Sequence, residues 1–287
     1  MIHPEKRIHC KKYRIVQNEE PVPGHRLMCL HAPEIAAGAK PGQFLHVRCA
    51  DSTDPLLRRP ISIHRVRRDE GLLFMFYRVA GRGTSLLTAK REGEEIDVLG
   101  PLGNGFELPS PGERVAVVGG GIGAAPLFFL VDEIMAEIHK RGADLTDEQD
   151  TARQALDFYL GAATGSLLPS LNSFLVRGVR VHMATDDGSV GYHGTVTGLL
   201  QQHLDEQTHI DRIYACGPAP MLRAIDELAI RRGIRGQLSL EERMGCGVGA
   251  CLSCACKIKN FSGDGFTYKH ACSDGPVFNI GEVWYGH

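Results

Sequence analysis

The sequence predicts a multidomain α+β protein with an N-terminal antiparallel β-barrel, a central α/β domain with a parallel sheet, and a small cysteine-rich C-terminal module. Three observations support this prediction: strand-like runs fill the first hundred residues, strands then alternate with helices, and four cysteines crowd into residues 246–256. A chain of 287 residues has room for about two domains of roughly 150 residues and a small third. We expect the domains to span residues 1–108, 109–237 and 238–287.

The first domain is expected to be built from strands. The runs QFLHVRCA, RPISIHRV, LLFMFYRVA and EIDVLGPLG are rich in β-branched or aromatic residues and are separated by Gly, Pro, Asp and Arg. This spacing is typical of an antiparallel barrel or sandwich. No segment with a helical period longer than a turn or two precedes residue 108.

After the proline-glycine break LPSPGE at 108–113, the pattern alternates. Strands are predicted at RVAVVGG, ALDFYLGAA, VRVHMAT and RIYACG, and helices at APLFFLVDEIMAEIHKRG, TVTGLLQQHL and APMLRAIDELAIRRG. Such alternation indicates a parallel sheet with helices on both faces. The polar segment 142–153 looks like an insertion, and we assign it no role.

Composition excludes several classes of protein. The net charge is −2 with acids and bases interspersed, which argues against a nucleic-acid or anionic-membrane partner. The first residues, MIHPEKRIHCKKYRIV, contain no apolar stretch of the kind found in an export signal, and apolar runs such as 127–131 are too short to span a membrane. We therefore expect a cytoplasmic protein with reduced thiols.

Two glycine-containing turns end strands of the predicted parallel sheet, where ligands of such sheets collect. The turn GGGIGAAP at 119–126 precedes a helix, so its amides and the helix N-terminus could hold a pyrophosphate. Its match to the Rossmann fingerprint is loose, and the second strand ends in LGAATGS without the acidic ribose ligand. A tight turn without a ligand remains open.

The second turn, YACGPAPML at 214–222, would place Cys216 near a bound nicotinamide, although a buried cysteine often serves only as a small packing residue. In the barrel, RRPISIHRV and GRGTSLL offer arginines and hydroxyls that suit a pyrophosphate. Such runs are also common on exposed strands, so both interpretations stay open at this point.

The cysteine pattern is more specific. Cys246-x4-Cys251-x2-Cys254, followed by Cys272, has the C-x4-C-x2-C…C form of a 2Fe-2S cluster site. The interleaved glycines allow backbone amides to turn toward sulfur. A zinc site would more often show two separated C-x2-C pairs. The spacing therefore predicts a C-terminal 2Fe-2S cluster module, with Cys256 as an extra, packed thiol.

Five motifs follow one another along the chain: RPIS, GT, GGGIGAAP, CGP and LEERMGCGVGACLSCACK…ACSDGPVF. In this order they resemble the electron-transfer subunit of NAD-linked dihydroorotate dehydrogenase, a family in the ferredoxin reductase superfamily. The resemblance covers nearly the whole chain. It implies FAD in the barrel, NAD at the parallel sheet and a 2Fe-2S cluster in the tail. The flavin motifs of the family fall on Arg59, Pro60, Ile61, Ser62, Phe76, Tyr77, Arg78, Gly83 and Thr84. In the two turns we expect cofactor binding by Gly120, Gly121, Gly123, Cys216, Gly217 and Pro218, and the cluster ligands are Cys246, Cys251, Cys254 and Cys272.

The resemblance implies an electron relay. A catalytic subunit carrying FMN would oxidise dihydroorotate in pyrimidine (UMP) biosynthesis, and electrons would pass through the cluster and FAD to NAD⁺. We name no acid–base residue in this chain, and we expect a heterotetramer of two copies of each subunit. Val277, Phe278 and Trp284 either contact the partner or cover the cluster.

Three alternatives remain open: the same module as the small subunit of a ferredoxin–NADP transhydrogenase or sulfhydrogenase, a zinc-stabilised binding module, and a self-sufficient reductase.

We also predict that the chain binds NAD in preference to NADP. The end of the second strand lacks a basic residue for a 2′-phosphate, and Asp186 and Asp187 close the neighbouring strand.

Overall fold

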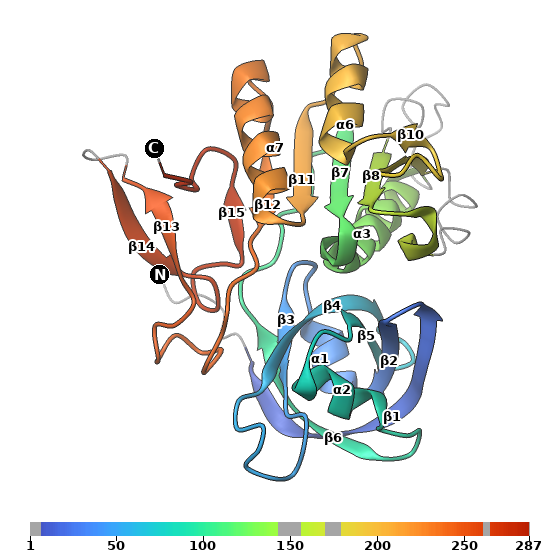
Figure 1. Ribbon diagram of the computed structural model, residues 1–287, viewed down its shortest axis with the longest axis vertical. Helices are drawn as coiled ribbons and strands as arrows, with labels where there is room; N and C mark the ends of the chain where they lie inside the picture. The colour runs from blue at the N-terminus through green and yellow to red at the C-terminus, as the bar shows by residue number, and fades with distance from the viewer. Residues whose placement is uncertain (1–6, 143–155, 170–178, 261–264, 287) are drawn as a thin grey trace.

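The computed structural model describes residues 7–142, 156–169, 179–260 and 265–286. A closed β-barrel lies below a mainly parallel sheet, and the cysteine-rich tail lies beside both (Figure 1). This arrangement confirms the predicted fold class. No helix in the described part of the chain is long and apolar enough to cross a membrane.

The barrel closes in the strand order β1-β2-β5-β4-β3-β6, with antiparallel neighbours throughout. Its residues alternate between the two faces of each strand, and those facing inward form one apolar core. Two short helices accompany the strands. The elements are β1 (His9–Val22), β2 (His25–His31), α1 (Pro33–Gly38), β3 (Phe44–Val47), β4 (Arg59–Arg67), β5 (Leu72–Arg78), α2 (Arg82–Thr88) and β6 (Glu95–Leu102).

The seven-stranded sheet has the order β10-β9-β8-β7-β11-β12-β15, and β15 is its antiparallel member. Its elements are β7 (Val115–Gly120), η1 (Gly121–Ala124), α3 (Ala125–Gly142), β8 (Leu156–Ala162), η2 (Gly165–Leu167), β9 (Arg180–Thr185), β10 (Tyr192–His193), α6 (Val196–Asp205), β11 (Arg212–Cys216), α7 (Ala219–Arg232), β12 (Arg235–Ser239) and β15 (Val277–Asn279). The predicted strands and helices of this region are confirmed.

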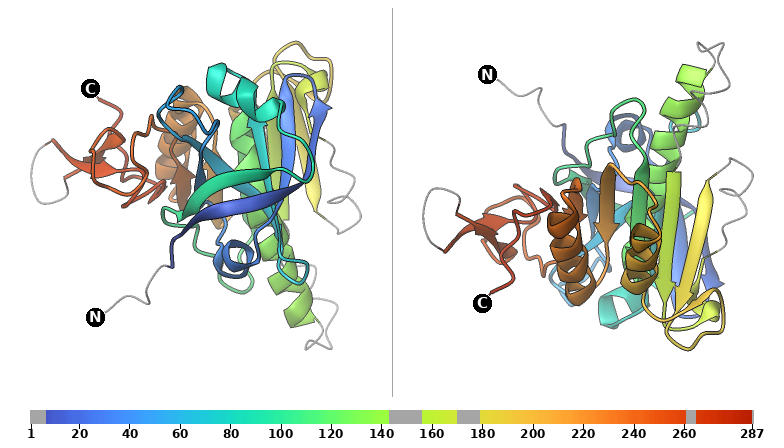
Figure 2. Two further views of the ribbon diagram at one scale, coloured as in Figure 1. Left: turned by 90° about the horizontal axis from the view of Figure 1, so that it is seen from below. Right: turned by 90° about the horizontal axis from the view of Figure 1, so that it is seen from above.

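The helices cover both faces of this sheet, as the alternation predicted. Helix α3 packs on one face with Val117 and Phe158, whereas α6 and α7 pack on the other with Val118 and Tyr159. The view from above in Figure 2 shows α3 on the opposite side of the strands from α6 and α7. Because these strands are buried on both faces, they appear in the sequence as nearly continuous apolar runs.

Helix α3 also joins the sheet to the barrel. The backbone carbonyl of Ala125 lies 2.8 Å from Nδ1 of the buried His64 on β4, and Asp132 pairs with Arg65 at 2.7 Å. Phe129 packs into the barrel core itself. The C-terminal ends of the parallel strands face the barrel (Figure 1), so this contact places the glycine turns against the barrel strands.

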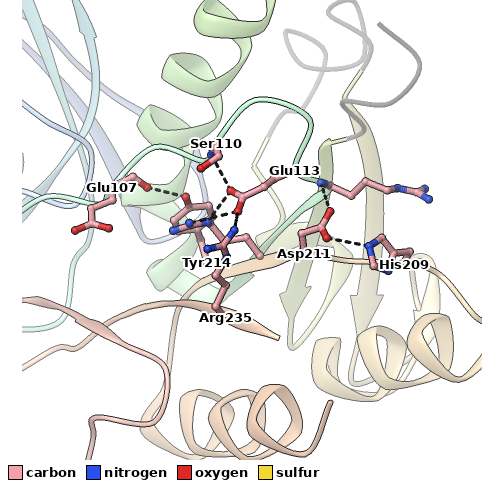
Figure 3. A network of polar contacts seen from close by, with 9 residues as sticks. Glu107, Ser110, Glu113, His209, Asp211, Tyr214 and Arg235 are labelled. Atoms are coloured by element: carbon pink, nitrogen blue, oxygen red, sulfur yellow. Dashed lines mark hydrogen bonds and ion pairs between the residues drawn. The ribbon is translucent and has the colours of Figure 1, made fainter. Parts of the chain in front are cut away.

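The opposite, N-terminal edge of the sheet is fixed to the linker between the two domains (Figure 3). Glu113 accepts hydrogen bonds from the backbone N–H of Ser110 at 2.7 Å and from Nε of Arg212 at 2.9 Å, and it also pairs with Arg235. The Tyr214 hydroxyl donates to the carbonyl of Glu107 at 2.6 Å. These contacts hold residues 107–113 along the sheet and fix where the barrel attaches.

The tail forms a hairpin of β13 (Ala255–Lys259) and β14 (Phe266–His270), and then returns to the sheet as β15. Strand β15 pairs with β12, a strand that the sequence analysis did not assign. The expected boundary between residues 237 and 238 falls inside β12. The expected insertion at 142–153 lies, beyond Gly142, outside the described residues.

Candidate cofactor sites and metal centre

The four predicted cluster cysteines lie close together at the junction of the tail and the barrel. The sulfurs of Cys254 and Cys272 are 3.2 Å apart. Cys246 and Cys251 form a second pair, because the backbone N–H of each approaches the sulfur of the other, at 3.3 and 3.4 Å. Two irons that each take two thiolates match this arrangement. Among the described residues, no three His, Cys, Asp or Glu side chains converge on a single point, as one metal ion would require.

Backbone amides surround these sulfurs. Val248, Ala250 and Cys251 direct N–H groups at the sulfur of Cys246, at 3.3 to 3.4 Å, and Gly249 directs one at Cys272 at 3.1 Å. The loop turns this sharply because Gly247 and Gly249 adopt positive φ angles of 74° and 80°. N–H donors stabilise thiolate ligands and the negative charge of a cluster. The residues present therefore fit a 2Fe-2S cluster.

The thiols differ in their acidity. The Ser253 side chain and nearby backbone groups lower the pKa of the exposed Cys251 thiol to about 6, which favours the thiolate that binds metal. Burial, together with the hydrogen bond to Cys254, raises the pKa of Cys272 to about 12. The Cys272 thiol is therefore protonated in the metal-free chain, and iron must displace that proton.

Cys256 lies apart from this group. Its sulfur approaches the backbone carbonyl of Lys269 at 3.4 Å, and its side chain packs with Ile258, Phe278 and Val283. Burial raises the pKa of its thiol to about 11. The position of Cys256 supports its assignment as a packing residue.

A cavity of about 310 Å³, here called the barrel cleft, lies where barrel, sheet and tail meet. Its lining includes guanidinium and hydroxyl donors, from Arg59, Arg78, Ser62 and Thr84. Donors of this kind suit a pyrophosphate. Tyr77 also lines the cleft, and its buried hydroxyl has no hydrogen-bond partner among the described residues. This donor set fits the pyrophosphate of FAD. Nine predicted residues line the cleft: Arg59, Pro60, Ile61, Ser62, Phe76, Tyr77, Arg78, Thr84 and Cys216.

A second cavity of about 400 Å³, here called the turn cavity, adjoins the barrel cleft. The two share four residues, namely Phe76, Arg78, Ile122 and Ala125. Gly121, from the first glycine turn, and Ala162 and Ala163, from the end of β8, line the turn cavity. It lies at the C-terminal edge of the parallel strands, where nucleotides bind in such sheets.

The remaining predicted glycines pack the turns together rather than line a cavity. A Cβ atom on Gly123 would lie 2.5 Å from the Cα of Gly217, so the two turns touch through their backbones. Gly120 lies against the side chains of Met221 and Pro218, and in the barrel Gly83 lies against the side chain of Arg59. Gly120, Gly123 and Gly217 shape the turns that carry Gly121 and Cys216.

The tail also contributes to the barrel cleft, which was not predicted from the sequence. Glu241, Glu242, Met244 and Pro276 line it. Met244 also packs on the group formed by Phe44, Leu102, Cys254, Ala271 and Cys272, and Phe44 belongs to the lining of the cleft as well. Phe44 and Met244 therefore connect the cleft to the cysteines. The only sequence signal was the position of LEERM directly before the first cysteine.

Val277 and Phe278, considered above as partner contacts, are buried in the sheet and beneath the hairpin. The apolar side chains exposed near the cysteines are instead Val248 and Leu252, at 49% and 58% exposure.

Comparison with known proteins identifies relatives of the tail and of the whole chain. Residues 241–284 match the family described as the iron-sulfur cluster binding domain of dihydroorotate dehydrogenase B. The electron transfer subunit of dihydroorotate dehydrogenase B (NAD⁺) from Desulforamulus reducens is 44% identical over 261 residues, which cover 91% of this chain and 93% of that protein. The subunit of the same name from Geobacillus thermodenitrificans is 44% identical over 253 residues, which cover 87% of this chain and 88% of that protein.

Among solved structures, an NADH-dependent reduced ferredoxin-NADP oxidoreductase, described in connection with flavin-based electron bifurcation, superposes with a TM-score of 0.79 at 28% identity. The match covers 95% of this chain and 90% of that one. The curated relatives are considerably more similar in sequence and align over nearly their whole lengths. This chain belongs to the family of dihydroorotate dehydrogenase B (NAD⁺) electron transfer subunits.

Proposed function

We propose that this chain passes electrons from the FMN of a dihydroorotate dehydrogenase catalytic subunit, through a 2Fe-2S cluster and FAD, to NAD⁺ in pyrimidine biosynthesis. The observation that carries this proposal is the continuous row formed by the cysteines, the barrel cleft and the turn cavity. Phe44 and Met244 join the first two, and four shared residues join the last two. A row of adjoining cofactor sites suits a chain that conducts electrons.

The cofactors supply the one-electron and hydride chemistry, and the chain binds and orients them. Arg59, Ser62 and Thr84 would hold the diphosphate of FAD in the barrel cleft. Cys246, Cys251, Cys254 and Cys272 would hold the irons, and the amides of the 246–251 loop would stabilise their negative charge. Phe44 and Met244 supply the apolar packing between the barrel cleft and the cysteines.

We infer a preference for NAD over NADP. The backbone N–H groups of Asp186 and Asp187 bond to the carbonyls of Ala162 and Ala163, at 3.1 and 3.2 Å. These alanines line the turn cavity, so the backbone of the two aspartates runs beside the end of β8, next to that cavity. A ribose 2′-phosphate in that region would be repelled.

Docking of the catalytic subunit is proposed at the cluster-binding loop. Val248 and Leu252 are exposed next to the cysteines, and Cys251 is itself exposed. A partner covering them would bring its own cofactor near the irons. Leu252→Asp should weaken partner binding by about tenfold or more, since it places a charge in an apolar contact. Leu56→Asp, on an exposed leucine of another loop, is the matched control.

Reconstitution tests the proposal. The purified chain should contain FAD, iron and acid-labile sulfide, and it should oxidise NADH with an artificial acceptor. It should show no dihydroorotate-dependent NAD⁺ reduction until an FMN-containing catalytic subunit is added, and the complex should have the mass of two copies of each chain. We place this assembly in the cytoplasm, where thiols remain reduced.

Other outcomes would favour the alternatives. Full dihydroorotate oxidation by the chain alone would contradict the proposal. Failure to bind the catalytic subunit, with cofactors present, would favour a transhydrogenase-type small subunit, the candidate to which the 28% identical structure points. Zinc in place of iron and sulfide would favour a binding module.

A further inference from the structure

Strand β3 is buried on both of its faces. Leu45 and Val47 point into the barrel core, whereas Phe44 and His46 alternate with them and lie on the outer face. Phe44 packs there with Cys254 and Cys272. The outer face of β3 is therefore the part of the barrel on which the cysteine-rich tail rests.

His46 lies beneath the loop that carries the first ligand. Its side chain is buried, with 1% exposure. A Cβ atom on Gly247 would come within 2.8 Å of its Nδ1, so the imidazole and the loop backbone are in direct contact. The polar group of the loop that acts on the ring is the backbone of Cys246, the first cluster cysteine.

The ring nitrogens of His46 are unsatisfied. Neither nitrogen reaches a described residue with full hydrogen-bond geometry, although the backbone of Cys246 lies near enough to act on the ring. An imidazole ring carries at least one N–H donor in either tautomer. A buried polar group without a partner is costly and calls for an explanation.

We propose that His46 is a positioning residue of the iron–sulfur centre, supplying from the barrel an N–H donor that the Cys246–Gly247 segment accepts when the cluster is bound. This inference rests on the proposed cluster. It assigns the barrel a direct part in setting the properties of a centre whose ligands all lie in the tail. Outer hydrogen bonds of this kind orient metal ligands and tune reduction potentials.

The direction of the effect follows from charge. A reduced cluster carries one more negative charge than the oxidised cluster, and a nearby N–H dipole stabilises it. Loss of the donor should therefore lower the reduction potential. A roughly tenfold change in the reduction equilibrium corresponds to about 59 mV for a one-electron couple.

The test is an EPR-monitored redox titration of the purified chain without a partner, together with the rate of iron loss to a chelator. His46→Leu, which removes both nitrogens at similar volume, should shift the equilibrium about tenfold, or about 59 mV, toward the oxidised cluster. It should also speed iron loss. His46→Asn, whose amide reaches the position of Nδ1, should restore most of both properties.

A glycine pair provides a second measurement if His46→Leu does not fold. Gly247→Ala and Gly249→Ala strain similar positive-φ backbones, but only the first new methyl group meets His46, because the nearest atoms to the second are those of Ser273 at 3.3 Å. Gly247→Ala should lower the potential more than Gly249→Ala.

The possible results separate the two proposals. An unchanged potential in His46→Leu, equal shifts in the Leu and Asn variants, or equal shifts in the two glycine variants would each overturn the role of His46 while leaving the relay intact. A wild-type chain without the EPR signal of a reduced 2Fe-2S cluster would overturn both.

Discussion

The contact between the two glycine turns can be tested with a single methyl group. In Gly123→Ala, the new Cβ would lie 2.5 Å from Cα and 2.6 Å from N of Gly217, whereas ordinary contact begins at 3.4 Å. Both neighbours are backbone atoms, so no side-chain rotation can relieve the clash. The turns must separate by about 1 Å, and such overpacking typically costs about 1–3 kcal/mol.

That separation should impair nucleotide binding. Gly121 lines the turn cavity and Cys216 lines the barrel cleft, and each belongs to one of the two turns. A displacement of about 1 Å at a positioning group can lower a rate by roughly 10²-fold. We therefore expect kcat/KM for NADH, measured with an artificial acceptor, to fall by about 10- to 100-fold.

Gly38→Ala is the matched control, because Gly38 is the last residue of α1 and has no atom within 4 Å of an added Cβ. This variant should retain wild-type kinetics. The melting temperature of Gly123→Ala should fall by roughly 2–4 °C for each kcal/mol lost. Wild-type kinetics and melting in Gly123→Ala would refute the reasoning, since the turns would then tolerate separation.

Three further predictions concern the cluster, the nucleotide and the linker. Cys272→Ser should lose most of the bound iron, whereas Cys256→Ser should keep it; the opposite result would reverse the ligand assignment. NADH should be used at least tenfold better than NADPH, because one misplaced charge readily costs about 1.4 kcal/mol; equal rates would contradict the part given to Asp186 and Asp187. Glu113→Ala should cost about 3 kcal/mol of unfolding free energy at pH 7, because it strands the mostly buried Arg212.

The effect of Glu113 should depend on pH. Burial would raise the pKa of this carboxyl, but the hydrogen bonds from Arg212 and Ser110 and the charge of Arg235 outweigh it, and the net pKa is lowered. A lowered pKa in the folded state gives stability that is fully present above the unfolded value of about 4.3 and is lost as pH falls through the folded value. Urea unfolding should show wild type and Glu113→Ala converging at low pH. A difference that persists there would assign the loss to packing.

The central sheet could be predicted from sequence because its signals are local. The run 115–120 is continuously apolar and ends in glycine, and the helix predicted over 125–142 has the bounds observed for α3. Strands β12 and β15 carried no such signal. β15 has only three residues, and its pairing with β12 is decided by tertiary contact, which propensity does not report.

The same distinction applies to the sites. Cysteine spacing predicted which four thiols gather, because three of them lie in one short segment and the hairpin of β13 and β14 returns the fourth to it. It could not predict that Met244 would line the barrel cleft or that His46 would lie under Gly247, since both contacts join segments about 200 residues apart. The burial of all four β3 residues, which shows that the outer face is covered, is known from the structure alone.

The return of the tail to the sheet has a consequence for how such chains can be shortened or recombined. β15 occupies the edge of β12, with Leu238 opposite Phe278. Removing the tail would uncover a row of unpaired backbone groups beside apolar side chains, the kind of edge that recruits strands from other molecules. The cluster-binding segment therefore cannot be removed without exposing the edge of β12. A flavin-only version of this protein would need a new way to close that edge before it could remain monomeric at high concentration.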